Sequence, residues 1–100
     1  MSEKVYSVDE ISAILSPIIL KYKADKAILF GSYAKNTADS ESDIDIMVVG
    51  GSEFDPTDIF CIADELNRKS QKRVDVYEER EIVLNSPLYS NIMKEGVVIV

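Results

Sequence analysis

The sequence predicts one small α/β domain, in which helices pack on a β-sheet. Apolar residues recur at helical spacing in two segments, a third segment carries helix start and stop residues, and short, mainly apolar runs suited to strands lie between them. The chain has 100 residues, of which 46% are hydrophobic. This is enough for one compact core and too little for two. We therefore expect residues 1–100 to form a single domain.

The opening helix is predicted from the capping-box spacing of Ser7 and Glu10, in which each side chain caps the other residue's backbone N–H. Farther along, Pro17 removes one backbone donor, so either the helix kinks there or Ser16 caps a second helical segment. The apolar face of this helix consists of Ile11, Leu15, Ile18 and Tyr22.

The second helix is expected to start at Asp55-Pro56, and the last one at Ser86-Pro87, with Gly96 at its end. Cys61 lies near the apolar stripe of the second helix, which suggests a buried small hydrophobic residue. That stripe consists of Ile59, Ile62, Ala63 and Leu66. The remaining elements are strands at residues 26–30, 43–49, 73–77 and 97–100, a helical turn at 32–36 and a polar loop at 39–42.

Composition excludes several classes of function. The chain has 11 basic and 18 acidic residues, and this net charge of -7 argues against general electrostatic binding of nucleic acid and favours a basic partner. With one cysteine and no histidine, it can form neither an intramolecular disulfide nor an ordinary Cys/His zinc site. No apolar run approaches the roughly 20 residues that span a bilayer, and the start lacks a signal peptide's apolar segment. We expect a cytoplasmic protein with no membrane partner.

Two neighbouring motifs indicate a phosphate cradle beside a metal site. Gly31 and Ser32 follow the apolar residues 27–30, and the glycine lets backbone N–H groups approach a phosphate. Asp43 and Asp45 lie on the next predicted strand, so both carboxylates face the same way, roughly 7 Å apart along the backbone. Mg²⁺ between them would offset their repulsion and take phosphate oxygens as further ligands. A solvated strand start in an acidic protein would show the same pair of aspartates.

Three further side chains could complete this site. Asp75 lies on a strand that can pair beside residues 43–49, where it would serve as a metal ligand, a general base or both. A charge that protects an exposed sheet edge is the alternative for this aspartate. Ser32 and Lys35 could bind one triphosphate together, whereas a helix cap and a solvated lysine are the ordinary roles of these residue types.

The chain resembles the polymerase-beta-like nucleotidyltransferases, in particular their minimal (MNT-type) single-domain members, in residues 29–35 (LFGSYAK) and 42–46 (SDIDI). Asp75 matches the later strand aspartate of that pattern, and the resemblance covers almost the whole chain. It implies an α/β core with a mixed sheet. One departure is Lys35-Asn36, where such proteins commonly have Arg-Gly. Lysine keeps the charge but loses the bidentate fork, and asparagine accepts a left-handed backbone.

The resemblance also implies an activity, a metal-dependent transfer of a nucleoside monophosphate from a nucleoside triphosphate to a hydroxyl group on a partner protein or an RNA. ATP is the expected nucleotide, and Mg²⁺ or Mn²⁺ the expected metal. The residues expected to catalyse the reaction and hold the metal are Asp43, Asp45 and Asp75, and those expected to bind the nucleotide are Gly31, Ser32, Lys35 and Ser42.

Minimal members of this family are often paired with a small helical HEPN protein, as the antitoxin of a toxin-antitoxin module. A chain that ends at Val100 is expected to need a partner's surface for its acceptor. Both a homo-oligomer and a hetero-oligomer are compatible with the sequence. A module that neutralises such a partner by contact alone is the alternative function. A phosphatase of the haloacid dehalogenase type is excluded, because Asp43 and Asp45 precede the apolar residues 47–49 instead of following them.

Overall fold

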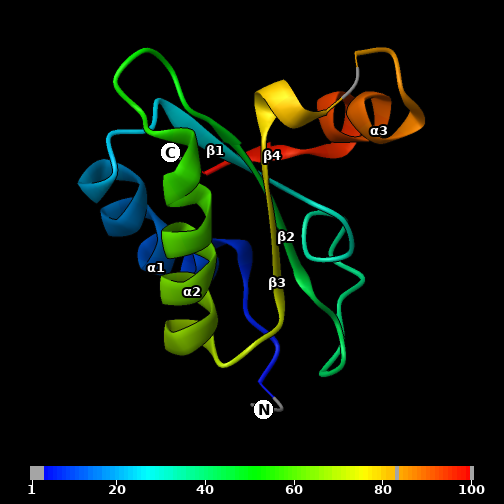
Figure 1. Cartoon of the computed structure of the whole chain (residues 1–100). Helices are drawn as coiled ribbons and strands as arrows, with labels where there is room; N and C mark the ends of the chain where they lie inside the picture. The colour runs from blue at the N-terminus through cyan, green and yellow to red at the C-terminus, as the bar shows by residue number, and fades with distance from the viewer. Residues whose placement is uncertain (1–3, 83, 100) are drawn as a thin grey trace.

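The fold is a four-stranded β-sheet with two helices on one face and a third helix on the other (Figure 1). The computed structural model describes residues 4–82 and 84–99. The strand order is β3-β2-β1-β4, in which β2 and β3 run parallel and the other neighbouring pairs run antiparallel. The predicted α/β fold with a mixed sheet is therefore confirmed.

The strands lie close to their predicted positions. β1 spans Lys26–Phe30 as predicted, whereas β2 (Ile44–Val49) and β3 (Val74–Glu78) each begin one residue later than expected. β4 is only Val97–Val98, and Val100 lies outside the described residues. Because β2 begins at residue 44, the first of the two predicted site aspartates lies just before the strand instead of within it.

The first helix, α1 (Val8–Lys21), begins at the predicted capping box. The Ser7 hydroxyl accepts from the backbone N–H of Glu10 at 3.1 Å, and the Glu10 carboxylate accepts from the backbone N–H of Ser7 at 3.0 Å. Pro17 lies inside this one helix, and the Ser16 hydroxyl donates to a backbone carbonyl one turn earlier. Ser16 therefore does not cap a second helix.

The other helices also begin as predicted. Asp55 accepts from the backbone at the start of a short 3-10 turn, Pro56–Asp58, which leads directly into α2 (Ile59–Ser70). α3 spans Pro87–Glu95. The prediction of a buried Cys61 is wrong, because this side chain is exposed. At about 100° per residue, a position two residues after the buried start of α2 faces away from the core.

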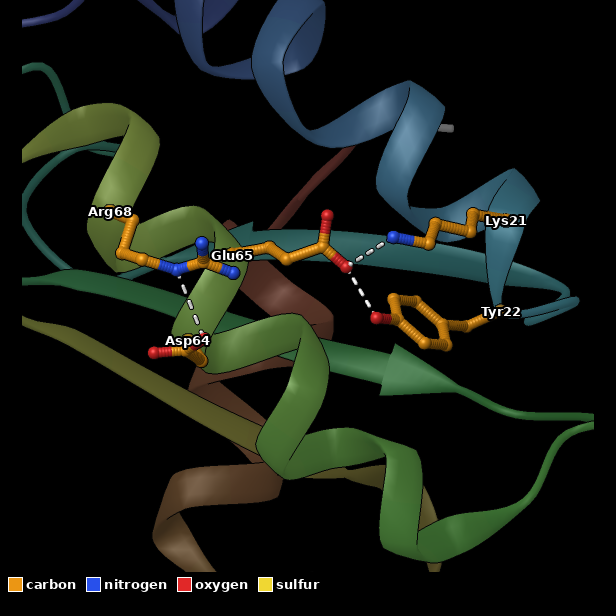
Figure 2. Close-up of polar contacts among 5 residues, drawn as sticks. All are labelled: Lys21, Tyr22, Asp64, Glu65 and Arg68. Atoms are coloured by element: carbon orange, nitrogen blue, oxygen red, sulfur yellow. Dashed lines mark hydrogen bonds and ion pairs between the residues drawn. The ribbon is translucent and has the colours of Figure 1, made fainter.

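Polar contacts join α1 to α2 at the surface. Glu65 of α2 accepts hydrogen bonds from the Lys21 ammonium, at 3.0 Å, and from the Tyr22 hydroxyl (Figure 2). These two donors, Tyr22 first, hold the pKa of Glu65 below its ordinary value. Arg68 pairs with Asp64 one turn apart on α2 (Figure 2). None of the helices in the described part of the chain is long and apolar enough to cross a bilayer.

The two faces of the sheet bury different cores. Side chains of successive strand residues alternate between the faces. The face under α1 and α2 carries the larger core, to which the strands contribute Ala27, Leu29, Ile44, Ile46 and Val48. The opposite face carries a smaller core beside α3, made of Ile28, Phe30, Met47, Ile82 and Ile92.

Candidate active site

Two predicted site aspartates lie side by side on the face of the smaller core. In the parallel pairing of β2 with β3, Asp45 lies opposite Asp75, and in the antiparallel pairing of β1 with β2 it lies opposite Phe30. Residues that are opposite each other in a sheet project to the same face. Phe30, Asp45 and Asp75 therefore form one row across three strands, and the predicted pairing of the two aspartate-bearing strands is confirmed.

The row places like charges together. The pKa of Asp45 is raised from its ordinary value of 3.8 to about 6, first by burial, then by the negative charges of Asp75 and Asp43, and by a hydrogen bond with Asp75. Ionised Asp45 is therefore poorly stabilised in this fold. A cation bound between these carboxylates would stabilise it, so the electrostatics of the pair suit a divalent metal.

The oxygen donors of this row fit magnesium in type and number. Mg²⁺ is commonly held by one or two protein carboxylates, together with waters and substrate phosphates. Among residues 4–82 and 84–99, no group of three or more His, Cys, Asp or Glu side chains is arranged to hold a metal ion. Asp45 and Asp75 would form the donor pair, and Asp43 lies partly buried just before β2. Metal binding by all three aspartates stays a prediction.

Gly31 lies directly against Asp45. Its backbone φ is +74°, and a Cβ atom at this position would lie 2.3 Å from Oδ2 of Asp45. Both the left-handed backbone and the lack of space disfavour a side chain there. The glycine therefore brings the turn after β1 into contact with the carboxylate row, which is the neighbouring position predicted for the phosphate cradle.

The segment after Gly31 is a run of turns that includes one helical turn, as predicted for residues 32–36, but it does not continue into a regular helix. The Gly31 carbonyl accepts from the backbone N–H of Lys35 at 3.2 Å, and the Ser32 carbonyl accepts from that of Thr37 at 3.0 Å. Asn36 has a φ of +61°. The departure from Arg-Gly is therefore accommodated in the backbone as expected, because asparagine adopts the left-handed conformation.

Two other predicted nucleotide-binding residues are engaged elsewhere. The Lys35 ammonium lies 3.1 Å from a carboxylate oxygen of Glu95 at the end of α3, and both side chains are about half exposed. The Ser42 hydroxyl accepts from the backbone N–H of Asp39 at 2.9 Å and donates to the Asp39 carboxylate at 3.2 Å. None of these contacts involves the aspartate row. The roles of Lys35 and Ser42 in binding a nucleotide therefore stay predictions.

Lys72 is a residue of this region that sequence reasoning missed. Its side chain is only 1% exposed, and its ammonium donates to the backbone carbonyl of Ser40 at 3.0 Å. The contact ties the loop before Asp43 to the segment that enters β3, and so helps to fix the two halves of the aspartate row. No sequence signal identifies it, because a lysine in a polar stretch is ordinarily exposed.

Tyr77 is a second missed residue. It lies two positions after Asp75 on β3, and its ring contacts that of Phe30 with centroids 5.9 Å apart. Burial, then the charges of Asp75 and Asp45, raise the pKa of its hydroxyl. Because strand side chains alternate between the faces of a sheet, Tyr77 lies on the same face as Asp75. This alternation could have predicted that an aromatic side chain lies next to the site.

Comparisons with known proteins match most of this chain. Residues 14–100 match the family model described as "Polymerase beta, Nucleotidyltransferase". The "Putative protein adenylyltransferase MJ0435" of Methanocaldococcus jannaschii is 35% identical over 91 residues, which are 91% of this chain and 96% of that protein.

Solved structures show the same fold. A toxin-antitoxin with AMP-PNP superposes with a TM-score of 0.76 at 23% identity, over 89% of this chain and 72% of that one. A tri-AMPylated Shewanella oneidensis HEPN toxin in complex with MNT antitoxin gives a TM-score of 0.60 at 22% identity, over 89% and 71% of the two chains. At these identities, the likeness concerns the fold alone.

Proposed function

Because this chain belongs to the polymerase beta nucleotidyltransferase family, we propose that it transfers AMP from ATP to a hydroxyl group of a partner protein. The observation that carries the proposal is the row of Asp45 and Asp75 against Gly31. A protein named as an adenylyltransferase among the relatives and an ATP analogue in a related fold support AMP as the transferred group.

The chemistry follows from the carboxylates. The acceptor hydroxyl oxygen forms a bond to the α-phosphorus of ATP, the bond from that phosphorus to the bridging oxygen breaks, and pyrophosphate leaves. Asp75 would take the hydroxyl proton, and its position on the edge strand of the sheet supports this role. Asp45, Asp43 and Asp75 would hold the Mg²⁺ or Mn²⁺ ion, which would neutralise charge on the phosphate oxygens.

The nucleotide is expected on the turn after β1. Backbone N–H groups beside Gly31 and the hydroxyl of Ser32 would face the phosphates, with Ser42 at the neighbouring loop. Lys35 would reach the triphosphate by leaving Glu95. An exposed ion pair contributes roughly 0 to 1 kcal/mol, so such an exchange costs little.

The proposed partner is a HEPN-type protein, toward which this chain would act as an antitoxin. The support is the related complex in which a HEPN toxin carries AMP groups beside an MNT antitoxin. A net charge of -7 also suits a basic protein partner better than RNA. Transfer to RNA is a distinguishable outcome of the same assay.

The test is a label-transfer assay with a purified HEPN protein as acceptor. Label from the α-phosphate of ATP should reach the acceptor with release of pyrophosphate, and label from the γ-phosphate should not. Asp45→Asn should abolish transfer, whereas Asp64→Asn, an exposed aspartate on α2, should leave it unchanged. Label on the acceptor from the γ-phosphate would contradict the proposal.

A module that neutralises its partner by contact alone is the second candidate. Its support is the pairing of Lys35 with Glu95, which draws the only lysine of the turn away from the aspartate row. The two functions can be distinguished by measuring how well the chain protects cells that produce the toxic partner. Protection lost in Asp45→Asn supports catalysis, whereas full protection together with no transfer by the wild type supports the contact module.

A further inference from the structure

The strand that carries Asp75 is also the edge of the sheet. No described strand lies beyond β3. The Arg73 carbonyl accepts from the backbone N–H of Ile44 in β2 at 3.0 Å. Since backbone groups alternate in direction along a strand, Asp75 and Tyr77 also bond toward β2, while Val74 and Val76 direct their N–H and C=O groups to the open edge.

A cavity of about 440 Å³ lies beside this edge, on the side of α2. Its apolar lining includes Ile59 and Phe60 of α2 and Val76 of β3, and its acidic lining residues are Glu78 and Glu81. Phe60 is 77% exposed, an unusual position for a large aromatic side chain. An exposed backbone edge next to an apolar cavity is the arrangement by which proteins bind an extended peptide as an added strand.

We propose that an extended, basic segment of the acceptor protein pairs with the outer edge of β3 as a fifth strand. An apolar side chain of the segment fills the cavity at Phe60, and a hydroxyl-bearing side chain lies beside Asp75. This inference rests on the proposed transfer to a protein hydroxyl. It identifies how the acceptor would reach the site and which sequence pattern it would carry.

The two faces of the sheet set the spacing within that segment. Val76 belongs to the core under α2, and Asp75 lies on the opposite face. An added strand also alternates between the faces, so its apolar and hydroxyl residues must be separated by an odd number of positions. The cavity lies level with Val76 to Glu78, one to three residues beyond Asp75, or roughly 3 to 10 Å at the usual strand rise. Separations of one and three therefore fit.

Charge favours a basic occupant over a second copy of this chain. Asp75 lies on the edge strand, and Glu78 and the exposed Glu81 line the cavity. Of the cations near them, Arg80 is already paired with Glu78, and the exposed Arg73 precedes the strand. A second copy would bring the same acidic strand and its own net charge of -7 to this edge. Like charges on paired strands are destabilising, whereas lysines in a partner segment would be attracted.

The probes are synthetic octapeptides rich in lysine, each with one leucine and one tyrosine separated by one, two, three or four positions. They are incubated with the full chain, ATP and Mg²⁺, and labelling of the tyrosine from α-labelled ATP is measured. Separations of one and three should give at least about tenfold more label than two and four, since a misplaced side chain forfeits about 1.4 kcal/mol or more. Equal labelling at all separations would overturn the spacing rule.

Binding is measured independently of chemistry from the backbone amide resonances of the isotope-labelled chain. The odd-separation peptides should shift the amides of Val74 and Val76. Phe60→Ala should reduce both the binding and the labelling of these peptides at least about fivefold without changing ATP affinity. Leu20→Ala, at a leucine on α1 that is 72% exposed, is the matched control and should change neither.

The outcomes separate this inference from the proposed function. Peptide shifts at Val74 and Val76 without any label transfer would support the edge site and contradict the chemistry. Transfer without those shifts, or transfer that Phe60→Ala leaves intact, would overturn the edge site and keep the chemistry. Concentration-dependent dimerisation of the chain alone, with shifts at the same amides, would assign the edge to a second copy and overturn the proposal.

Discussion

The two faces of the sheet differ in what they bury, and adjacent residues of β2 show the difference. Ile46 is fully buried under α1 and α2, while Asp45 lies on the opposite face with two other carboxylates nearby. One face supplies most of the apolar burial. The other face, only partly covered beside α3, carries the groups for chemistry. A strand with a side-chain period of two can therefore serve stability and function with alternate residues.

The face that carries the aspartates has unfavourable electrostatics, which the rest of the fold must offset. The carboxylate of Asp45, which packs beside Gly31, is repelled by those of Asp75 and Asp43, and this repulsion costs stability in the absence of a cation. The larger core on the far face offsets that cost. We therefore expect mutations on the two faces to affect stability with opposite signs.

The largest expected effect is at Ile46. Ile46→Ala should lower the free energy of unfolding by about 2 to 5 kcal/mol, because it leaves a cavity in the larger core. The neighbouring change Asp45→Asn should not destabilise the ligand-free protein. Denaturant unfolding of both variants measures the contrast, and equal losses in the two would show that the faces are not distinct.

The next effect compares two glycines with the same backbone. Gly31 and Gly51 both have a φ of +74°, and a Cβ atom at either would meet a carboxylate, that of Asp45 or that of Asp25. Both alanine variants should lose about 1 to 2 kcal/mol of stability, because L-residues are strained in this conformation. Only Gly31→Ala should also weaken ATP binding, measured by calorimetry with Mg²⁺. The same loss of affinity in Gly51→Ala would count against a special role for Gly31.

A smaller effect concerns pH. Since the pKa of Asp45 is raised from 3.8 to about 6, the folded protein holds a proton between these values that the unfolded chain releases. This group therefore costs stability above pH 6, and its cost disappears as the pH falls toward 4. Asp45→Asn should be about 1 kcal/mol more stable than the wild type at pH 7, after allowance for solvent screening. Chemical denaturation of both proteins from pH 7 to 4 should show their stabilities converging, and a constant difference would refute this origin.

The smallest expected effect is at the exposed pair of Lys35 and Glu95. Glu95→Gln should release the lysine and raise ATP affinity about two- to fivefold, and Lys35→Ala should lower it by a similar factor. Lys94→Ala, at a neighbouring exposed lysine, is the control. Unchanged dissociation constants for ATP in both variants would show that Lys35 is an ordinary surface residue.

Local sequence patterns predicted the elements well where a single short-range interaction determines them. The capping box of Ser7 and Glu10 set the start of α1, and the run at 26–30 became β1 unchanged. Sequence patterns failed to predict the burial of some side chains, because burial depends on the direction in which a side chain points and not only on the element that carries it. Cys61 lies on a correctly predicted helix but faces solvent, and Lys72 is buried although its neighbours are polar.

The sequence by itself determined the family, the strands, and the residue types at the candidate site, because motifs such as Gly31-Ser32 and Asp43-Ile44-Asp45 depend only on spacing. Tertiary structure decided which of these residues meet. The parallel register places Asp75 beside Asp45, which is 30 residues away in the sequence, and Gly31 contacts the carboxylate of Asp45, which is 14 residues away. Such pairings are fixed by burial of the whole sheet, whose energy is shared among many residues, and no local pattern specifies them.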